Sequence, residues 1–229
     1  MKNLLKEKAS DPLRGRNLAL IDFIKDNNFK DKLVLDVGCG FGWLEFYLKN
    51  QVKEIIGIDF DRENIKTCKK YIKEKNVRFE VSDALNLPIK TESVDVVISS
   101  ELLEHLPKDS EIIFFNEIFR VLKKDGVLYL TTPFNNFWSN LLDPAFWLIG
   151  HRHYSYGDLR EMANNSGLKV VKYKIGGKWW SMINLINFYM CKWVFKRKEF
   201  FEDFLKKKEK EEFFKNDGYM NIFLVFKKI

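Results

Sequence analysis

LVLDVGCGFG, residues 33–42, combines a short apolar run with a loop in which every second residue is glycine. A nearly continuous apolar run of this length is typical of a strand that is buried on both faces of a parallel sheet. The segment 43–50 follows the loop and predicts a helix. Glycines at such a turn allow a ligand to approach the backbone, and the start of the helix offers free N–H groups. This stretch therefore predicts a binding site for a nucleotide-like ligand.

Strands and helices alternate on both sides of this stretch. Further strands are expected at 55–59, 77–81, 94–99, 127–132, 169–175 and 221–226, and helices at 13–27, 62–74, 109–122 and 155–166. Such alternation, with turn residues in between, is typical of right-handed crossovers between parallel strands. We therefore expect an α/β fold, a doubly wound and mostly parallel Rossmann-like sheet with helices on both faces, in a single domain over residues 1–229.

Two segments interrupt this alternation. Residues 134–155 carry several aromatic side chains, including Trp138 and Trp147, and predict a lid. Residues 176–218 lie between the last two expected strands and predict an inserted helical cap with an aromatic front half and a Lys/Glu-rich back half. Within the charged run 196–215 of the cap, the segment 200–208 is expected to form a solvated amphipathic helix, so its basic residues are only weak evidence for nucleic acid binding.

Composition narrows the class of protein. The chain has 229 residues, 46% of them hydrophobic, and a net charge of +7 from 39 Lys and Arg against 32 Asp and Glu. This excludes a disordered or collagen-like chain. The three cysteines, without a CxxC pair, argue against a disulfide framework or a zinc ribbon. No apolar leader and no apolar stretch of about 18 residues is present, so we expect a cytoplasmic protein.

The spacing of the glycines separates two kinds of nucleotide site. A dinucleotide fingerprint needs its third glycine at position 43, where this chain has Trp43, and this disfavours a nicotinamide cofactor. Asp59 ends the next strand and is placed to hydrogen-bond a ribose diol, as in other doubly wound nucleoside sites. Asp83, after the third strand, could accept a hydrogen bond from an adenine amino group.

Five ordered blocks complete the pattern: VLDVGCGFG (34–42), IIGIDFD (55–61), VSDALNLP (81–88), VDVVISSELLEHL (94–106) and IFRVLKKDGVLYLTTP (118–133). In these blocks the chain resembles the class I S-adenosylmethionine-dependent methyltransferases of the type 11-like group. The resemblance covers about the first 135 residues and rests on far more than one glycine loop. It implies the fold expected above, methyl transfer as the activity, and S-adenosylmethionine as the cofactor.

The resemblance also implies which residues surround that cofactor: Asp36, Gly38, Cys39 and Gly40 beside its methionine moiety, Asp59 on the ribose hydroxyls, Phe60 stacked on the adenine, Asp83 with Ala84 at the adenine amino group, and Ser100 at the end of the fourth strand. For Phe60 the alternative is a place in the hydrophobic core. For the glycine loop the alternative is a tight turn without a ligand.

Glu101-Leu102-Leu103-Glu104-His105 follows the fourth strand, close to where the transferred methyl is expected. If this segment is helical, its three polar residues lie on one face and could hold a divalent cation or orient a base. The pattern is similar to the metal site of small-RNA ribose methyltransferases and ubiquinone-pathway O-methyltransferases, with His153 as a further ligand. It also occurs in relatives that bind no metal. We expect His105 to act as a general base or to orient the acceptor, with no metal assigned.

The segment 179–198 has an apolar stripe at helical spacing, followed by Lys196, Arg197 and Lys198. The stripe consists of Trp179, Met182, Ile183, Ile186, Met190, Trp193 and Val194. One interpretation is a helix that roofs the acceptor pocket or packs on a second subunit of a homodimer. The alternative is peripheral contact with an anionic membrane face.

These observations predict an S-adenosylmethionine-dependent methyltransferase that acts on a small, hydrophobic or lipid-linked acceptor, most simply at oxygen. The acceptor is expected beneath Trp138, Trp147, Tyr154 and the cap. The alternatives are an RNA ribose methyltransferase, disfavoured because no RNA-binding module is recognisable, and a noncatalytic, membrane-associated scaffold that binds the cofactor.

Overall fold

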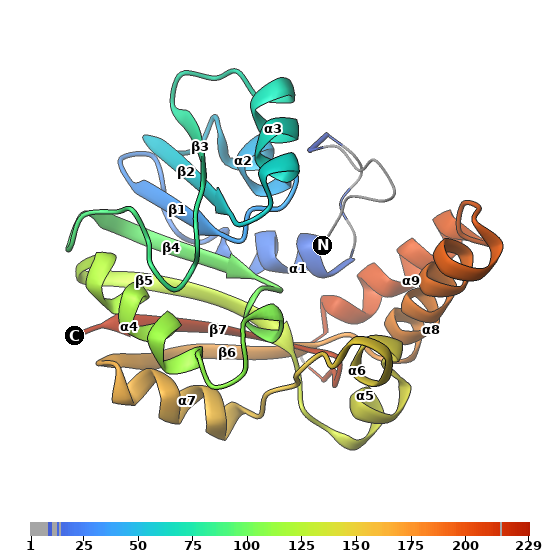
Figure 1. The fold of residues 1–229 in the computed structure, drawn as a ribbon. Helices are drawn as coiled ribbons and strands as arrows, with labels where there is room; N and C mark the ends of the chain where they lie inside the picture. Colours follow the sequence, from blue (N-terminus) through green and yellow to red (C-terminus); the bar gives the residue numbers. More distant parts are fainter. Residues whose placement is uncertain (1–8, 11–12, 14, 216) are drawn as a thin grey trace.

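A single seven-stranded sheet organises the chain, of which the computed structural model describes residues 9–10, 13, 15–215 and 217–229. The strand order is β3-β2-β1-β4-β5-β7-β6 (Figure 1). The strands are β1 (Leu33–Val37), β2 (Glu54–Asp59), β3 (Val77–Val81), β4 (Val94–Ser100), β5 (Leu122–Pro133), β6 (Leu168–Gly176) and β7 (Asn221–Lys228). β1 to β5 pair in parallel, whereas β7 runs antiparallel between β5 and β6. This confirms the expected doubly wound, mostly parallel sheet.

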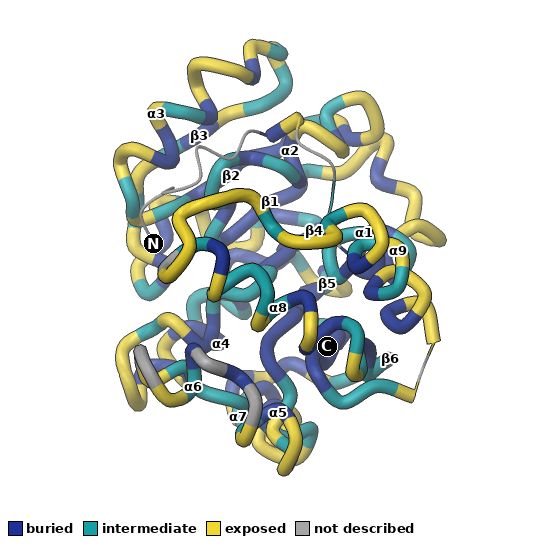
Figure 2. The backbone as a smooth tube through the Cα atoms, turned by 90° about the vertical axis from the view of Figure 1, so that its right-hand side faces the viewer, coloured by how far each residue is buried: buried dark blue, intermediate teal, exposed yellow. Residues whose placement is uncertain are grey.

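Helices cover both faces of the sheet. α1 (Gly15–Ile24), α2 (Trp43–Leu48) and α3 (Arg62–Tyr71) lie on one face, and α4 (Glu111–Val121) and α7 (Tyr156–Asn165) lie on the other (Figure 1). Buried backbone is concentrated in the strands, and exposed segments are concentrated in the outer helices and loops (Figure 2). The helices lie where the sequence predicts them, with ends shifted by a few residues.

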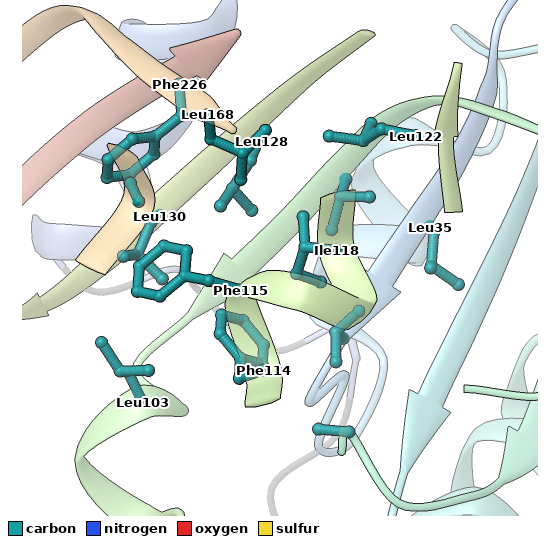
Figure 3. Close-up of a cluster of buried hydrophobic side chains, with 14 of the residues drawn as sticks. Leu35, Leu103, Phe114, Phe115, Ile118, Leu122, Leu128, Leu130, Leu168 and Phe226 are labelled. Atoms are coloured by element: carbon teal, nitrogen blue, oxygen red, sulfur yellow. The ribbon is translucent and has the colours of Figure 1, made fainter. Parts of the chain in front are cut away.

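The largest core cluster lies between the sheet and α4. Phe114, Phe115 and Ile118 of α4 are fully buried against side chains of β5, β6 and β7 (Figure 3). Phe115 and Phe226 meet edge to face, with their ring centroids 5.7 Å apart. Burying one such ring stabilises the fold by about 1.5–3 kcal/mol, so this cluster anchors the sheet that carries the site.

The helices of the two interrupting segments lie beyond the carboxyl ends of the parallel strands (Figure 1). They are α5 (Phe137–Leu142), α6 (Pro144–Ile149), α8 (Trp179–Tyr189), the π-helical turn η2 (Met190–Phe195) and α9 (Glu202–Phe213). α9 packs against both α8 and α1. In an open α/β sheet, ligands bind at this edge, so these helices are placed to enclose a binding site.

Two sequence expectations need correction. The segment 200–208 is not a freely solvated helix, because it forms the start of α9, which buries Leu205 and, just beyond the segment, Glu209, Glu212 and Phe213. The strand expected at 127–132 begins at Leu122, which already pairs with Val94. In both cases the partners come from distant parts of the chain. Within the described residues, no helix has the length and apolar character needed to cross a bilayer.

Candidate functional site

The glycine loop after β1 leaves space for a ligand. Gly38, Gly40 and Gly42 have φ values of 86°, 54° and 84°, a left-handed region that favours glycine. The N–H groups of Gly38 and Cys39 donate to the Ile58 carbonyl oxygen of β2 at 2.7 and 2.9 Å, so the loop is held by backbone. A Cβ added at Gly40 would meet no atom within 4 Å. The loop is therefore a firm, open cradle that fits a ligand in contact with the backbone.

Asp59 links this loop to the end of β2. Its Oδ2 accepts from the Gly40 N–H and its Oδ1 from the Asp61 N–H, both at 2.8 Å. The carboxylate is half-buried, and Oδ1 also accepts from Asn64 Nδ2 at 3.3 Å. Oδ2 keeps a lone pair, so it can also accept from a ligand hydroxyl. Phe60 is 80% exposed, which excludes the alternative that it belongs to the core.

The end of β3 lies next to the end of β2. The Ser82 N–H donates to the Asp59 carbonyl oxygen at 3.1 Å, which joins the two strand ends. Asp83 is exposed and its Oδ1 accepts from the Leu85 N–H at 2.9 Å, whereas Ala84 is buried. The structure therefore brings Phe60, Asp83 and Ala84 to neighbouring strand ends, as the sequence predicts.

A buried carboxyl pair lies beneath the loop. Asp36 of β1 is 3% exposed and Glu45 of α2 is fully buried. Burial raises the pKa of both groups, and the Asp36 charge raises that of Glu45 further, whereas the contact with Glu45 lowers that of Asp36. The net direction is upward for both, so the pair retains a proton at neutral pH. A Cβ at Gly57 would lie 2.3 Å from Glu45 Oε1, so only glycine fits there. Sequence reasoning missed Glu45, although Gly57 inside a buried strand was a signal of close approach.

A cavity of about 270 Å³ extends from the glycine loop toward the cap. Loop residues Phe41 and Trp43 line one side, and Ser100 at the end of β4 lines the base, where its hydroxyl lies 3.0 Å from the Thr131 hydroxyl. α1, α8 and η2 contribute further wall residues: Arg16, Asn17, Ser181, Asn184, Leu185, Phe188, Tyr189 and Lys192. The lining mixes aromatic and polar side chains.

Glu101 is held at the cavity wall by three other elements. Its carboxylate accepts from Asn221 Nδ2 at 2.9 and 3.1 Å, from Arg16 Nη1 at 3.2 Å and from the Thr131 hydroxyl at 3.0 Å. Glu104 is buried, and its Oε2 accepts from the Thr132 hydroxyl at 3.0 Å. Sequence reasoning missed Arg16 and Asn221, because no local pattern marks residues that meet only in the folded chain.

The segment that follows Glu101 is not a regular helix. Glu101 has a φ of 55°, and only the short 3₁₀ turn η1 (Leu103–His105) follows it. The expected helical face with Glu101, Glu104 and His105 is therefore wrong in geometry. Among the described residues, no three His, Cys, Asp or Glu side chains are arranged to hold a metal ion.

His105 lies at the rim of the cavity and contacts the lid segment. Its Nδ1 lies 3.2 Å from Nε2 of His151, whose Nδ1 lies 3.8 Å from Asp143 Oδ2. Partial desolvation, and then the neighbouring His151, lower the pKa of His105 below its ordinary value. His105 is therefore neutral at pH 7. His153 is not part of this contact, because its ring nitrogens face Asn140 and Asp143 at 2.8 and 3.0 Å.

The aromatic residues expected over the acceptor lie elsewhere. Trp138 is 43% exposed and packs on Trp179, Trp147 is 66% exposed, and buried Tyr154 donates to Glu111 Oε1 at 2.9 Å. None of the three expected residues lines the cavity, and α8 takes that place. Helix α8 of the cap thus lines the cavity, whereas these three side chains of the lid do not.

Carboxylates of α9 hold α8 in position. Glu212 accepts from the backbone N–H groups of Lys178, Trp180 and Ser181 at 2.9 to 3.0 Å and so caps the start of α8. Glu209 accepts from Asn184 Nδ2 at 2.7 Å. These bonds satisfy the free N–H groups at the helix start that no local side chain caps.

The sheet order, the open glycine cradle and the acidic side chains at the ends of β1 to β3 define a nucleoside-binding domain of the doubly wound class. Residues 35–130 match the family model described as a methyltransferase domain.

Curated relatives of the chain are also methyltransferases. A probable S-adenosylmethionine-dependent methyltransferase of Mycolicibacterium smegmatis is 28% identical over 137 residues, which covers 60% of this chain and 52% of that protein. A ubiquinone biosynthesis O-methyltransferase of Pelagibacter ubique is 29% identical over 135 residues, which covers 53% of this chain and 55% of that protein. The chain thus spans about half the length of these relatives.

A solved structure shares the fold. A proposed sarcosine dimethylglycine methyltransferase from Galdieria sulphuraria superposes with a TM-score of 0.68 at 18% identity and covers 93% of this chain and 84% of that one. These similarities identify residues 35–130 as a class I S-adenosylmethionine-dependent methyltransferase domain. Its cofactor is S-adenosylmethionine.

Proposed function

We propose that the protein transfers a methyl group to a hydroxyl of a small acceptor that has a polar head and an apolar or lipid-linked remainder. The observation that supports this most is the cavity between the glycine loop and α8, with His105 at its rim. Oxygen as the methylated atom agrees with the similarity to a ubiquinone biosynthesis O-methyltransferase. The lid over 134–155 and the cap over 176–218 then enclose the acceptor. The lid lines the cavity through His151, and the cap lines it through α8.

The residues that would hold the cofactor lie along the ends of four neighbouring strands. When bound, S-adenosylmethionine supplies a methyl group on an electrophilic sulfonium. We assign Asp36, Gly38, Cys39 and Gly40 to its methionine side, Asp59 to the ribose, Phe60, Asp83 and Ala84 to the adenine, and Ser100 to the base of the site. The open space above Gly40 and the exposed ring of Phe60 support this assignment.

His105 is proposed to take the proton from the acceptor hydroxyl. In the tautomer in which its Nδ1–H donates to His151 Nε2, the Nε2 atom of His105 is left to accept that proton. The imidazole is neutral at pH 7, so one ring nitrogen carries a lone pair that can accept the proton, while the lowered pKa makes it a weaker base than an ordinary histidine. Asp143, next to His151, keeps a charge that favours the protonated histidine pair once the proton has arrived.

The cavity lining indicates the kind of acceptor. Arg16, Glu101 and Asn221 form a hydrogen-bonded group on one side, and Leu185 and Phe188 present apolar surface from α8. A polar head suits the first side and an apolar remainder suits the second. A hydroxylated ring with an apolar tail has both features.

The test is methyl transfer by the wild-type protein and by His105→Ala to a panel of phenolic acceptors with apolar tails. Loss of a general base lowers turnover by about 10²–10⁴-fold. The affinity for S-adenosylhomocysteine, measured by calorimetry, should stay within about twofold, because His105 touches no part of the assigned cofactor site. Tyr173→Phe serves as the control, since Tyr173 is an exposed ring on β6 that does not line the cavity. Equal turnover by His105→Ala and wild type, or transfer only to RNA, would contradict the proposal.

A further inference from the structure

The helix α8 is inverted relative to an ordinary surface helix. Its polar side chains Ser181 and Asn184 are buried and bond to the carboxylates of α9. Its apolar side chains at the opposite positions point away from the protein. A surface helix of a soluble protein buries its apolar stripe. The exposed apolar face of α8 therefore indicates a surface that binds a partner.

The exposed face is one continuous stripe along α8 and η2. Its members follow the helical spacing of four, three, four and four residues: Trp179, Ile183, Ile186, Met190 and Val194. Each is between 37% and 61% exposed. We call these five residues the α8 stripe. Trp193, which the sequence also assigns to a stripe, lies outside the side chains that the structure describes, and Met182 is buried.

Aromatic rings extend the α8 stripe at both ends. Trp138 of α5 packs on Trp179 with ring centroids 5.2 Å apart, and Phe137 beside it is 69% exposed. At the other end, Phe195 packs on Phe200 and Phe201 is 80% exposed. Trp and Phe are side chains that favour the boundary between water and lipid.

A basic cluster directly follows the α8 stripe. Lys196, Arg197 and Lys198 are exposed, and in the described part of the chain none of them makes an ion pair with a carboxylate. The Arg197 guanidinium lies 4.2 Å from the centroid of the Phe200 ring. The nearby acid Glu202 is instead paired with Lys206 on α9. The cluster therefore keeps its positive charge for an external partner.

We propose that the α8 stripe and the basic cluster Lys196–Lys198 form a docking surface for an anionic lipid bilayer, on which α8 lies parallel to the membrane plane. The apolar side chains would enter the outer hydrocarbon layer, and the cations would meet lipid phosphates or carboxylates. Charge favours a bilayer over a second copy of this chain, because a second copy brings another +7 whereas an anionic surface brings the opposite sign.

The cavity and the proposed membrane surface lie on opposite sides of α8. Ser181, Asn184, Leu185 and Phe188 line the cavity, while the α8 stripe lies on the other side of the same helix. One helix thus separates the cavity from the proposed membrane surface. Docking does not depend on the proposed acceptor, and it can be measured without any acceptor.

The test is cosedimentation of the purified chain with vesicles of phosphatidylcholine alone and with 30 mole per cent phosphatidylglycerol, a proportion set at roughly that of an anionic membrane. We expect binding to the anionic vesicles that weakens as salt is raised. Ile183→Ser with Ile186→Ser should lower the partition coefficient about tenfold, because two apolar side chains no longer enter the bilayer. Lys196→Glu with Lys198→Glu should lower it by a similar factor only for anionic vesicles.

The matched control for the apolar change is Ile112→Ser with Ile113→Ser on α4, where both side chains are also exposed. It should bind vesicles as the wild type does. Affinity for S-adenosylhomocysteine, unchanged in all variants, shows that they are folded. The proposal is overturned if the wild type does not bind anionic vesicles, or if the α4 control loses as much binding as the α8 stripe variant. It is also overturned if light scattering shows that the wild type is a dimer and the stripe variant a monomer, and neither of them binds vesicles.

Discussion

The glycine-loop side and the cap side of the cavity are held together by different kinds of contact. Asp59 on the loop side bonds to Asp61, two residues away, and to Gly40, on the adjacent strand end. Glu212 on the cap side bonds to Lys178, Trp180 and Ser181, which lie between 31 and 34 residues away. The loop side is held by contacts between adjacent strand ends, most of them to backbone N–H groups at most 20 residues away, whereas the cap side is held by carboxylates of a helix more than 30 residues further along the chain.

The comparison predicts that the two sides can be damaged separately, with the largest effect at Asp59. Asp59→Ala removes the carboxylate that holds the Gly40 N–H and that we assign to the ribose hydroxyls. Hydrogen bonds to a charged group contribute about 1.5–3 kcal/mol, so the affinity for S-adenosylhomocysteine should fall by up to about 100-fold in calorimetric titration. Asp125→Ala, which removes an exposed carboxylate far along the sheet, should leave the affinity unchanged. An unchanged affinity in Asp59→Ala would remove Asp59 from the cofactor site.

A second, smaller effect is expected on the cap side. Glu212→Ala leaves the backbone N–H groups at the start of α8 without their acceptor, which should lower the free energy of unfolding by about 2 kcal/mol in urea titration. The affinity for S-adenosylhomocysteine should not change. Glu211→Ala is the matched control, because Glu211 is an exposed neighbour that pairs only with Lys208 among the described residues. A loss of cofactor affinity in Glu212→Ala would show that the two sides are coupled rather than independent.

The smallest effect concerns pH and the carboxyl pair beneath the loop. Burial raises the pKa of Asp36 to about 8 and raises that of Glu45 as well. A carboxyl whose pKa is higher in the folded chain favours folding while it is protonated, so this contribution is present at low pH and is lost as the pH rises through the folded value. The melting temperature should therefore fall between about pH 5 and pH 8.

Glu45→Gln removes one titrating group but keeps the shape of the side chain. The fall in stability between these pH values should become smaller by about 1 kcal/mol. Glu63→Gln, which replaces an exposed carboxyl on α3, should follow the wild type. If Glu45→Gln shows the same pH dependence as the wild type, Glu45 does not titrate with a raised pKa in the folded chain.

Hydrophobic patterning predicted most of the sheet, because strands buried on both faces need apolar runs whatever surrounds them. β1 and β3 begin and end where expected, and Gly38, Gly40 and Gly42 have the left-handed backbone that their spacing suggests. The prediction was wrong where an element depends on a distant partner. α9 was expected in solvent because its charged pattern does not reveal that Glu209 and Glu212 bond to α8.

The aromatic lid illustrates the same limit. Trp138 and Trp147 are apolar residues next to the site in sequence, and their chemistry favoured a place over the acceptor. In the folded chain they are exposed, and Phe188 and Leu185 of α8 line the cavity. Composition indicates that a segment is apolar, but the direction of each side chain depends on how the segment packs.

By itself, the sequence determined the doubly wound sheet, the ligand-binding turn after β1 and the order of polar residues at the strand ends. These features follow from short-range rules: apolar periodicity, the backbone freedom of glycine and the shared edge of parallel strands. Only the tertiary structure decided that Arg16 and Asn221 hold Glu101, that His151 faces His105, and that α8 turns its polar side inward. These contacts join residues far apart in the chain, and their geometry is set by packing rather than by local pattern.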